Sequence, residues 1–473
     1  MKLGSHPFVA PGLGLAFLFA AGPAAEATTY EVGPGKPLAN VGDVPWESLN
    51  AGDTVLIYYR TTPYKEKFVL SRVGTAAAPI TVRGVLGPSG ERPILDGDGA
   101  TTRSTLSYYS RSRGVIKIGG STVPFADGTT VMPQYLVIEN LEIRNARPPY
   151  SFTGPTGAVE SYPNNASSIY LEFGRNITVR NCDLHDNGNG FFAFSSDTIL
   201  TEDLLVEGNY IHDNGNVGSN FEHNTYVEAR HVTYQYNHFG PLYPGASGNN
   251  IKDRSAGLVV CYNWIDGGNR QLDLVNAEDS SALRADLDYG NDFVYGNVII
   301  EHPNSGNNDT VLYGGDTGAA NKYRKKTLFF YNNTFISYRT DAVRLFRMST
   351  NDQSIDARNN IAYVTAAGPN LQLLDNYGRL TLTNNWFKAG YTPFTVAHAK
   401  GSITFVNNVE STTGSPGFVS LATEDFHLAS GSECIDAGVL PTPTPVDQEY
   451  VKHQSSTVRN ITGTTIDIGA YEF

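Results

Sequence analysis

Cysteine, charge and long apolar stretches are all scarce in this 473-residue chain. It has three cysteines, and charged residues make up 17% of it. Apart from an apolar run at residues 12–21, no segment approaches the roughly 20 apolar residues that a membrane helix needs, so we predict no membrane span. The net charge of -13 argues against nucleic acid as a partner. It does not exclude an acidic polysaccharide, because a local cluster of Lys and Arg can make one cleft positively charged in an acidic protein.

The first 27 residues have the pattern of a secretory signal peptide. Lys2 supplies a positive charge, the apolar run follows it, and Ala25-Glu26-Ala27 has the form of a cleavage site. We therefore expect a secreted or periplasmic protein whose mature chain begins near Thr28.

Glycine and aromatic residues are abundant, and a short phrase repeats along the chain. The 48 Gly, 27 Tyr and 23 Phe are typical of a turn-rich, all-β extracellular protein. The phrase consists of alternating apolar residues that lead into Asn, and successive copies lie between 23 and 36 residues apart. The copies end at Asn145, Asn181, Asn209, Asn237, Asn263, Asn297 and Asn332, with weaker ones at Asn359, Asn384 and Asn407.

This repeat predicts a single-stranded, right-handed parallel β-helix. One unit alone cannot bury its apolar face, but stacked units can, and Asn at a bend can bond to the Asn of the next coil to form a ladder. We expect a monomer with an N-terminal cap and first coils at 28–100, the β-helix and its groove at 101–410, and a C-terminal cap at 411–473.

The repeat also separates two of the cysteines. Cys182 and Cys261 fall about three coils apart, roughly 14 Å at the spacing of strands in a sheet, whereas a disulfide needs Cα atoms within about 7 Å. We predict that this pair is not bridged and that buried free thiols are present.

Functional residue types are densest in three successive coils, at residues 222–228, 249–255 and 271–276. Successive side chains of a strand point to opposite faces. If Thr225, Ile251 and Leu272 point inward, an outer wall carries the residues between them. That wall is predicted to hold Asn224, Tyr226, Glu228, Lys252, Arg254, Gln271 and Asp273.

This mixture suits β-elimination from a uronic acid. The proton at C5 can be removed once the sugar carboxylate is neutralised, by Arg254 or by a metal ion. Lys252 is the candidate base, and Tyr226 or His223 the candidate donor to the leaving oxygen. The candidate substrate-binding residues are Asn224, Glu228, Gln271 and Asn276. Asp266 and Asp273 are candidate ligands for Ca²⁺.

Each candidate also has a structural explanation. Lys252 and Arg254 can pair with nearby carboxylates on a solvated face. His223 can be a loop residue bonded to a carbonyl, and Tyr226 one more stacked aromatic ring. Asp266 lies in a Gly-rich turn, where turn chemistry alone favours Asp.

Residues 100–470 resemble the pectate-lyase-like β-helix superfamily. Within them, Asn250 to Ser255 and Tyr262 to Gly268 resemble more weakly the alginate lyase and chondroitinase B family. That resemblance implies a base role for Lys252 and a Ca²⁺-ligand role for Asp266. The family's L-x-L-R-H-G strand is replaced here by residues 271–276, so its Arg has no counterpart, and Arg254 is the conjectured substitute.

We therefore predict a polysaccharide lyase acting on a uronate-containing glycan. A glycoside hydrolase using Asp253, Asp266 or Asp273 is one alternative, although the Gly-His-Gly turn and Arg-Ile-Lys strand of polygalacturonases are absent. A non-catalytic glycan-binding β-helix is another. A C5-epimerase is a further alternative, although the Asp-Pro-His motif of mannuronan epimerases is absent.

Overall fold

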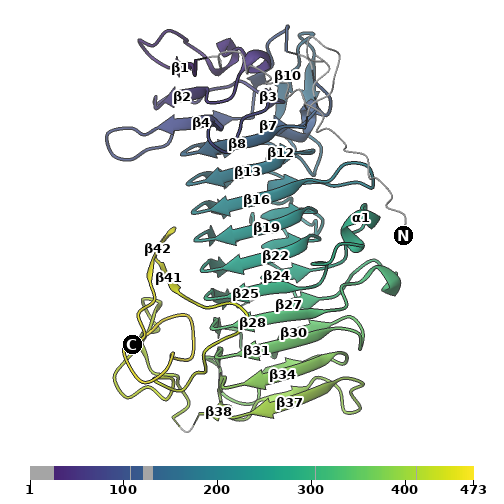
Figure 1. Cartoon of the computed structure of the whole chain (residues 1–473), viewed down its shortest axis with the longest axis vertical. Helices are drawn as coiled ribbons and strands as arrows, with labels where there is room; N and C mark the ends of the chain where they lie inside the picture. Colours follow the sequence, from purple (N-terminus) through teal and green to yellow (C-terminus); the bar gives the residue numbers. More distant parts are fainter. Residues whose placement is uncertain (1–25, 107, 121–131, 304, 412) are drawn as a thin grey trace, which may run out of the picture.

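The chain winds into a tall stack of coils in which three parallel sheets run the length of the molecule (Figure 1). This computed structural model describes residues 26–106, 108–120, 132–303, 305–411 and 413–473. The predicted signal peptide lies almost wholly outside these residues. Across the described residues the fold is the predicted right-handed parallel β-helix.

Most coils contribute one strand to each sheet, in the order sheet 1, sheet 2, sheet 3; the first two coils and the last one lack a strand in sheet 2 or sheet 3. Sheet 1 contains β1 (Thr29–Val32), β2 (Thr54–Tyr58), β4 (Ile80–Val85), β8 (Gln134–Glu139), β13 (Arg175–Arg180), β16 (Glu202–Glu207), β19 (Arg230–Gln235), β22 (Ala256–Cys261), β25 (Asp292–Tyr295), β28 (Thr327–Tyr331), β31 (Ser354–Arg358), β34 (Arg379–Thr383) and β37 (Ser402–Val406).

The strands of sheet 2 are short and follow those of sheet 1 after a tight corner. They are β5 (Ile94–Asp96), β9 (Glu142–Arg144), β14 (Asp183–His185), β17 (Tyr210–His212), β20 (His238–Phe239), β23 (Trp264–Asp266), β26 (Val298–Glu301), β29 (Thr334–Ser337), β32 (Ile361–Val364), β35 (Trp386–Phe387) and β38 (Val409–Glu410).

Sheet 3 completes each coil, and a loop then leads to the next strand of sheet 1. Its strands are β3 (Phe68–Leu70), β7 (Gly114–Ile118), β12 (Ser167–Leu171), β15 (Asn189–Ala193), β18 (Thr225–Val227), β21 (Ile251–Asp253), β24 (Leu272–Leu274), β27 (Asp309–Tyr313), β30 (Val343–Met348), β33 (Leu371–Leu374) and β36 (Thr392–Phe394).

Helical and peripheral elements are short. The helices are α1 (Ser281–Arg284) and the 3₁₀ turns Val41–Asp43, Trp46–Ser48, Arg111–Arg113 and Ala320–Lys322. The peripheral strands are β6 (Ala100–Thr101), β10 (Ser151–Thr153), β11 (Val159–Ser161), β39 (Phe418–Ser420), β40 (Asp425–Leu428), β41 (Gln448–Val451) and β42 (Ser455–Val458).

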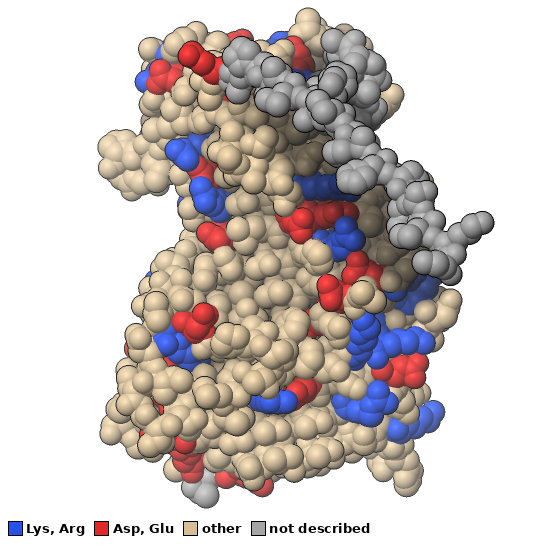
Figure 2. Space-filling model, viewed as in Figure 1, with Lys and Arg blue, Asp and Glu red and all other residues tan. Residues whose placement is uncertain are grey.

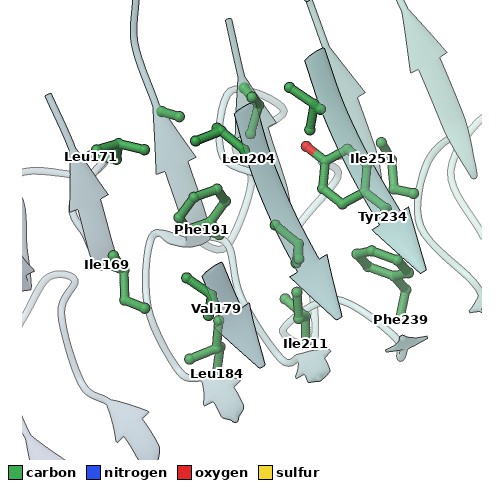
Figure 3. Close-up of a cluster of buried hydrophobic side chains, with 14 of the residues drawn as sticks. Ile169, Leu171, Val179, Leu184, Phe191, Leu204, Ile211, Tyr234, Phe239 and Ile251 are labelled. Atoms are coloured by element: carbon green, nitrogen blue, oxygen red, sulfur yellow. The ribbon is translucent and has the colours of Figure 1, made fainter. Parts of the chain in front are cut away.

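The core is a column of apolar side chains enclosed by the three sheets (Figure 3). At one level, Val179 of sheet 1, Leu184 of sheet 2 and Phe191 of sheet 3 meet inside the stack, all at most 1% exposed. The next coils place their apolar residues in register above and below them. This confirms that the repeat is a burial unit, because each coil covers the apolar edge of its neighbour.

A ladder of buried asparagines lines the corner between sheets 1 and 2. In each rung, the side-chain amide donates to the carboxamide oxygen of the next Asn at 2.8–3.0 Å, and the backbone N–H usually does the same. The members are Asn209, Asn237, Asn263, Asn297, Asn333, Asn360, Asn385 and Asn408. This confirms the predicted ladder from Asn209 to Asn297, whereas the predicted anchors Asn145 and Asn181 are not members of it.

The repeat phrase places some ladder members one residue too early. Asn332, Asn359, Asn384 and Asn407 do not form the rungs; they adopt left-handed backbone conformations with φ of 48° to 55°, and the following Asn enters the ladder. The left-handed region admits Asn more readily than most residues. Two adjacent Asn thus serve two different purposes at these corners.

All three cysteines, Cys182, Cys261 and Cys434, are buried free thiols, which confirms the prediction. Cys182 stands at the ladder position of its coil, where its backbone N–H donates to Asn209 Oδ1 at 2.9 Å.

The C-terminal segment, expected to cap the open end, packs along the flank of the stack (Figure 1). Its contacts spread over several coils: Gln454 donates to the carbonyl of Gly208, and the carbonyl of Asp467 accepts from Asn332. In the last coil, most residues of β37 stay exposed, including Phe405 at 44%. No helix in the described part of the chain is long and apolar enough to cross a membrane.

We expect the Asn263→Ala variant to be destabilised. The substitution removes the acceptor of Asn237 and two donors to buried carbonyls, and each buried polar group left unpaired costs about 1–3 kcal/mol. Thermal unfolding followed by circular dichroism should show a lower midpoint. Asn460→Ala, at an exposed position, is the control and should leave the midpoint unchanged. Equal midpoints for the two variants would contradict a stabilising ladder.

Candidate active site

The predicted outer wall forms on sheet 3. The register pairs Tyr226 of β18 with Lys252 of β21 and Lys252 with Asp273 of β24. The alternate positions Thr225, Ile251 and Leu272 are fully buried. A cavity of 370 Å³ opens over the three outward residues. The structure therefore brings Tyr226, Lys252 and Asp273 together, as the strand pattern predicts, and their catalytic roles remain predictions.

Lys252 is held by two carboxylates. Its ammonium donates to Asp273 Oδ2 at 2.6 Å and to Asp316 Oδ2 at 2.7 Å. The predicted role of base needs Lys252 as a free amine. This geometry instead stabilises an ammonium that acts as a hydrogen-bond donor.

Arg254 connects Asp316 to Tyr226. Its Nη1 and Nη2 donate to the two carboxylate oxygens of Asp316 at 3.2 and 3.1 Å, and its Nε donates to the Tyr226 hydroxyl at 2.9 Å. Burial raises the pKa of Tyr226 to about 12, although the Arg254 charge opposes this. Burial tends to raise the pKa of Asp316, but Lys252 and Arg254 outweigh it and hold that pKa below its usual range.

His223 lies beside this cluster as a neutral ring. The backbone N–H of Asn249 donates to Nδ1 at 2.9 Å, so the ring proton is on Nε2. Burial, followed by the charges of the nearby Lys and Arg side chains, lowers the pKa of His223 well below its usual value. His223 lines the cavity and stacks near Tyr226 with ring centroids 5.8 Å apart.

Two further residues complete the wall. Arg270 approaches Asp273 Oδ1 at 3.3 Å, and the Asn249 amide donates to Asp273 Oδ2 at 2.9 Å. The cavity is therefore lined by three cationic side chains, from Lys252, Arg254 and Arg270.

The candidate substrate-binding residues do not face the cavity. Asn224 is fully buried and bonds to Asn214, Asn250 and the carbonyl of Gly240, so the expectation that it points outward is wrong. It belongs to a second asparagine ladder at the corner between sheets 2 and 3. The Gln271 amide is equally buried and donates to the carbonyls of Gly267 and Ile300.

Glu228 and Asn276 organise loops around the site. Glu228 is 1% exposed and accepts from the backbone N–H groups of 278–280, which fixes the loop before α1. Burial raises the pKa of Glu228 to about 7. Asn276 Oδ1 accepts from the backbone N–H of Asp316 at 3.3 Å and so helps to position that carboxylate.

Asp266 and Asp273 do not form the predicted Ca²⁺ site. Asp266 belongs to sheet 2, where its carboxylate bonds to His302, whereas Asp273 is on sheet 3 and contacts Lys252 and Arg270. A carboxylate occupied by cationic side chains is poorly suited to a second cation.

One other group has metal-ligand chemistry. Among the described residues, Glu142, Asp183 and His185 bring three potential ligand atoms within 4.8 Å of one another. They lie on sheet 2, away from the sheet that carries Lys252.

Asp253, a candidate carboxylate for hydrolysis, lies inside the β-helix. It is 0% exposed and bonds to Arg324, which also bonds to Asp292 at 2.6 Å. This buried ion group holds the strand segment between Lys252 and Arg254 in place.

Three connected cavities form a groove across the coils. The central one holds Lys252 and Arg254, a larger one of 850 Å³ adjoins it at Phe221 and Tyr226, and a third of 380 Å³ adjoins it at Arg270 and Asp316. In the view of Figure 2, acidic and basic side chains alternate along the edge of the stack that carries α1 in Figure 1.

Sequence reasoning missed Asp316 and Arg270. Asp316 lies in the Gly314-Gly315-Asp316-Thr317-Gly318 loop after β27, where turn chemistry alone accounts for Asp. The strand register of the structure explains its position: β27 pairs with β24, so the loop that follows β27 begins beside the strand that carries Asp273.

We expect Arg324→Met to destabilise the protein by about 3–5 kcal/mol, because removing one partner leaves Asp253 and Asp292 buried without a counter-charge. Denaturant unfolding followed by tryptophan fluorescence measures the effect. The matched control is Lys325→Met, which removes a neighbouring exposed ion pair with Asp352 and should cost about 1 kcal/mol or less. Similar midpoints for both variants would show that the buried group is not a structural anchor.

Comparison with known proteins supports the fold. Residues 109–256 match the family model described as "Right handed beta helix region". The structure is similar to that of pectate lyase Pel9A, with a TM-score of 0.51 and 14% identity, over 95% of this chain and 97% of that one. No curated protein matches the sequence.

Two other solved structures show more distant similarity. An alginate lyase from Paenibacillus sp. str. FPU-7 has a TM-score of 0.44 and 16% identity, over 70% of this chain and 93% of that one. A GH136 lacto-N-biosidase from Eubacterium ramulus has a TM-score of 0.43 and 13% identity, over 80% of this chain and 67% of that one. The chain thus shares the right-handed β-helix fold with pectate lyase, and the structural neighbours include polysaccharide lyases.

Proposed function

We propose that this protein is a secreted polysaccharide lyase that cleaves a uronate-containing glycan by β-elimination. The observation that carries the proposal is the binding of one carboxylate by two cations: Asp316 accepts hydrogen bonds from both Lys252 and Arg254. A uronate carboxylate has the same chemistry, and we propose that it replaces Asp316 on this pair. Arg270 adds a third positive charge to the cavity.

Neutralising the sugar carboxylate makes the C5 proton removable. The negative charge that develops when this C–H bond breaks spreads onto the carboxylate, where Lys252 and Arg254 stabilise it. In this proposal both residues keep their protons. They bind and orient the sugar and supply positive charge without a metal ion.

Tyr226 transfers the proton. As a phenolate stabilised by Arg254, it takes the C5 proton while the C4–O bond breaks and the C4=C5 double bond forms. The hydroxyl then gives this proton to the leaving oxygen, so the elimination consumes no water. His223 carries its proton on Nε2, where it can donate a hydrogen bond to the sugar, but as a neutral ring it is a poor acid.

A glycoside hydrolase is the second candidate, because Asp273 and Asp316 share one ammonium and are therefore close together. Hydrolysis needs one carboxyl group that stays protonated. Lys252 and Arg254 hold the pKa of Asp316 low, which suits an anion better than an acid. New reducing ends without ultraviolet absorbance from a double bond would favour this candidate.

Substitutions separate the roles of the two central residues. Tyr226→Phe should lower kcat about 10²–10⁴-fold, the usual contribution of a proton-transfer group. Lys252→Arg should retain more activity than Lys252→Met, because the charge is kept while the amine is lost. Release of unsaturated product, followed by ultraviolet absorbance in the presence of a chelator, measures both effects. Equal loss in Lys252→Arg and Lys252→Met would return the base role to Lys252.

Activity should increase with pH. The reactive form of Tyr226 is the phenolate, and because its pKa is about 12 in the free enzyme, this form increases about tenfold per pH unit below that value. His223 stays neutral because its pKa is lowered, so its titration does not change the rate near neutral pH. The measurement is kcat/KM from pH 6 to 10, with circular dichroism to check folding. A rate that falls above pH 7 while the fold persists would rule out Tyr226 as base.

A further inference from the structure

The largest of the three cavities differs in chemistry from the central one. We call it the aromatic cavity: it is lined by Tyr170, Phe192, Phe194 and Phe221 and shares Phe221 and Tyr226 with the central cavity. Tyr170, Phe192 and Tyr226 are in register on three successive coils of sheet 3. A glycan lying across the coils and passing Lys252 therefore continues over this aromatic surface.

The charges of the aromatic cavity do not favour an anionic sugar. Among its lining residues, the acidic ones are Glu222 and Asp279 and the basic one is Arg113. The central cavity has equal numbers of each, with Lys252, Arg254 and Arg270 beside Asp273, Glu278 and Asp316. A uronate in the aromatic cavity would meet two carboxylates and a single guanidinium, so its own negative charge would be repelled there more than it is attracted.

Glu222 has an unused acceptor. The residue is 3% exposed, and its Oε2 is buried without a hydrogen-bond partner among the described residues. Buried polar atoms are almost always paired, so this oxygen calls for a donor. Sugar hydroxyls are donors, whereas an ionised carboxylate is an acceptor only.

Arg113 has two donors without a partner among the described residues, and its guanidinium lies over two aromatic rings. Its guanidinium carbon lies 4.6 Å from the ring centroid of Tyr170 and 5.0 Å from that of Phe192, which is cation–π geometry. Its Nε and Nη2 are buried and have no hydrogen-bond partner in the described part of the chain. Hydroxyl and ring oxygens of a sugar can accept from them.

Phe221 offers an apolar surface between the two cavities. Its side chain is 76% exposed, although most aromatic residues of this fold are packed in the core or in stacks. An exposed ring at the junction of two cavities can pack against the C–H face of a sugar.

We propose that the aromatic cavity binds a neutral sugar, so that the substrate is a heteropolysaccharide in which a uronic acid adjoins neutral sugars. This rests on the proposed lyase function for the identity of the uronate, while the neutral-sugar site rests on Glu222, Arg113 and Phe221. A homopolymer of uronic acids would place a carboxylate against Glu222 and Asp279.

The first test compares substrates. Wild-type kcat/KM is measured on a polymer of alternating glucuronate and N-acetylglucosamine, on polygalacturonate and on polymannuronate. We expect the alternating polymer to be used at least about tenfold better, the factor that 1.4 kcal/mol of discrimination gives. Higher kcat/KM on either homopolymer would overturn the proposal.

The second test compares variants. Phe221→Ala should raise KM for the alternating polymer by about fivefold, since it removes an aromatic contact. Glu222→Gln should lower KM for the homopolymers, because it removes a negative charge. Phe405→Ala, which truncates an exposed ring in the last coil, is the control and should change nothing. If Phe221→Ala matches this control and Glu222→Gln leaves the homopolymer KM unchanged, the neutral-sugar site is wrong.

A binding measurement keeps the two proposals apart. If no polymer yields unsaturated product, the lyase function fails, and retardation in gels that contain the alternating polymer or a neutral N-acetylglucosamine polymer then tests the cavity. Retardation that Phe221→Ala abolishes and Phe405→Ala preserves supports the neutral-sugar site. Wild-type protein that neither polymer retards overturns it.

Discussion

The stacking of coils in register is the constraint on which the rest of this protein depends. Each coil exposes a row of backbone N–H and C=O groups and an apolar edge, and the next coil covers both. The ladder from Asn209 to Asn408 fixes the corner of every coil it crosses, so a side chain on one coil lies directly over its counterpart on the next. Because register slips would turn side chains to the other face of the sheet, the ladder also fixes which residues reach the groove.

The strand register brings charged residues that are distant in the sequence into contact with one another. Lys252, Arg254 and Arg270 share a cavity with Asp273 and Asp316, and every one of these charges has a partner. The interior repeats this arrangement with Asp253, Arg324 and Asp292, which support the same strand from below. Charges buried this deeply persist only when they are paired. The proposed uronate carboxylate enters such a network by exchange for one of its members.

The side chains that line the groove change in character along the axis of the β-helix. Its central cavity pairs three cationic side chains with carboxylates, whereas the neighbouring cavity presents Phe192, Phe221 and Glu222, whose Oε2 has no hydrogen-bond partner among the described residues. The proposed substrate, in which a uronic acid adjoins neutral sugars, would place its two kinds of sugar on these two kinds of surface. The fold contributes the length of the groove, and the loops between sheets contribute its chemistry.

The sequence by itself determined the architecture and one wall of the site. The spacing of Asn209, Asn237 and Asn263 predicts the coils, because it is a repeat that can be read along the chain. Alternation of side chains along β18 and β21 predicts that Tyr226 and Lys252 face the same side, because this pattern is local. Only the tertiary structure decided which side chains these residues contact. Asp316 comes from a loop of the next coil, and Arg324 binds Asp253 inside the β-helix. Asn224 joins a ladder and does not face the groove. Strand periodicity does not predict these contacts, because they depend on loop length and on the geometry of the corners. The separation of Asp266 from Asp273 has the same cause: the chain turns a corner between them, and residues seven positions apart end on different sheets.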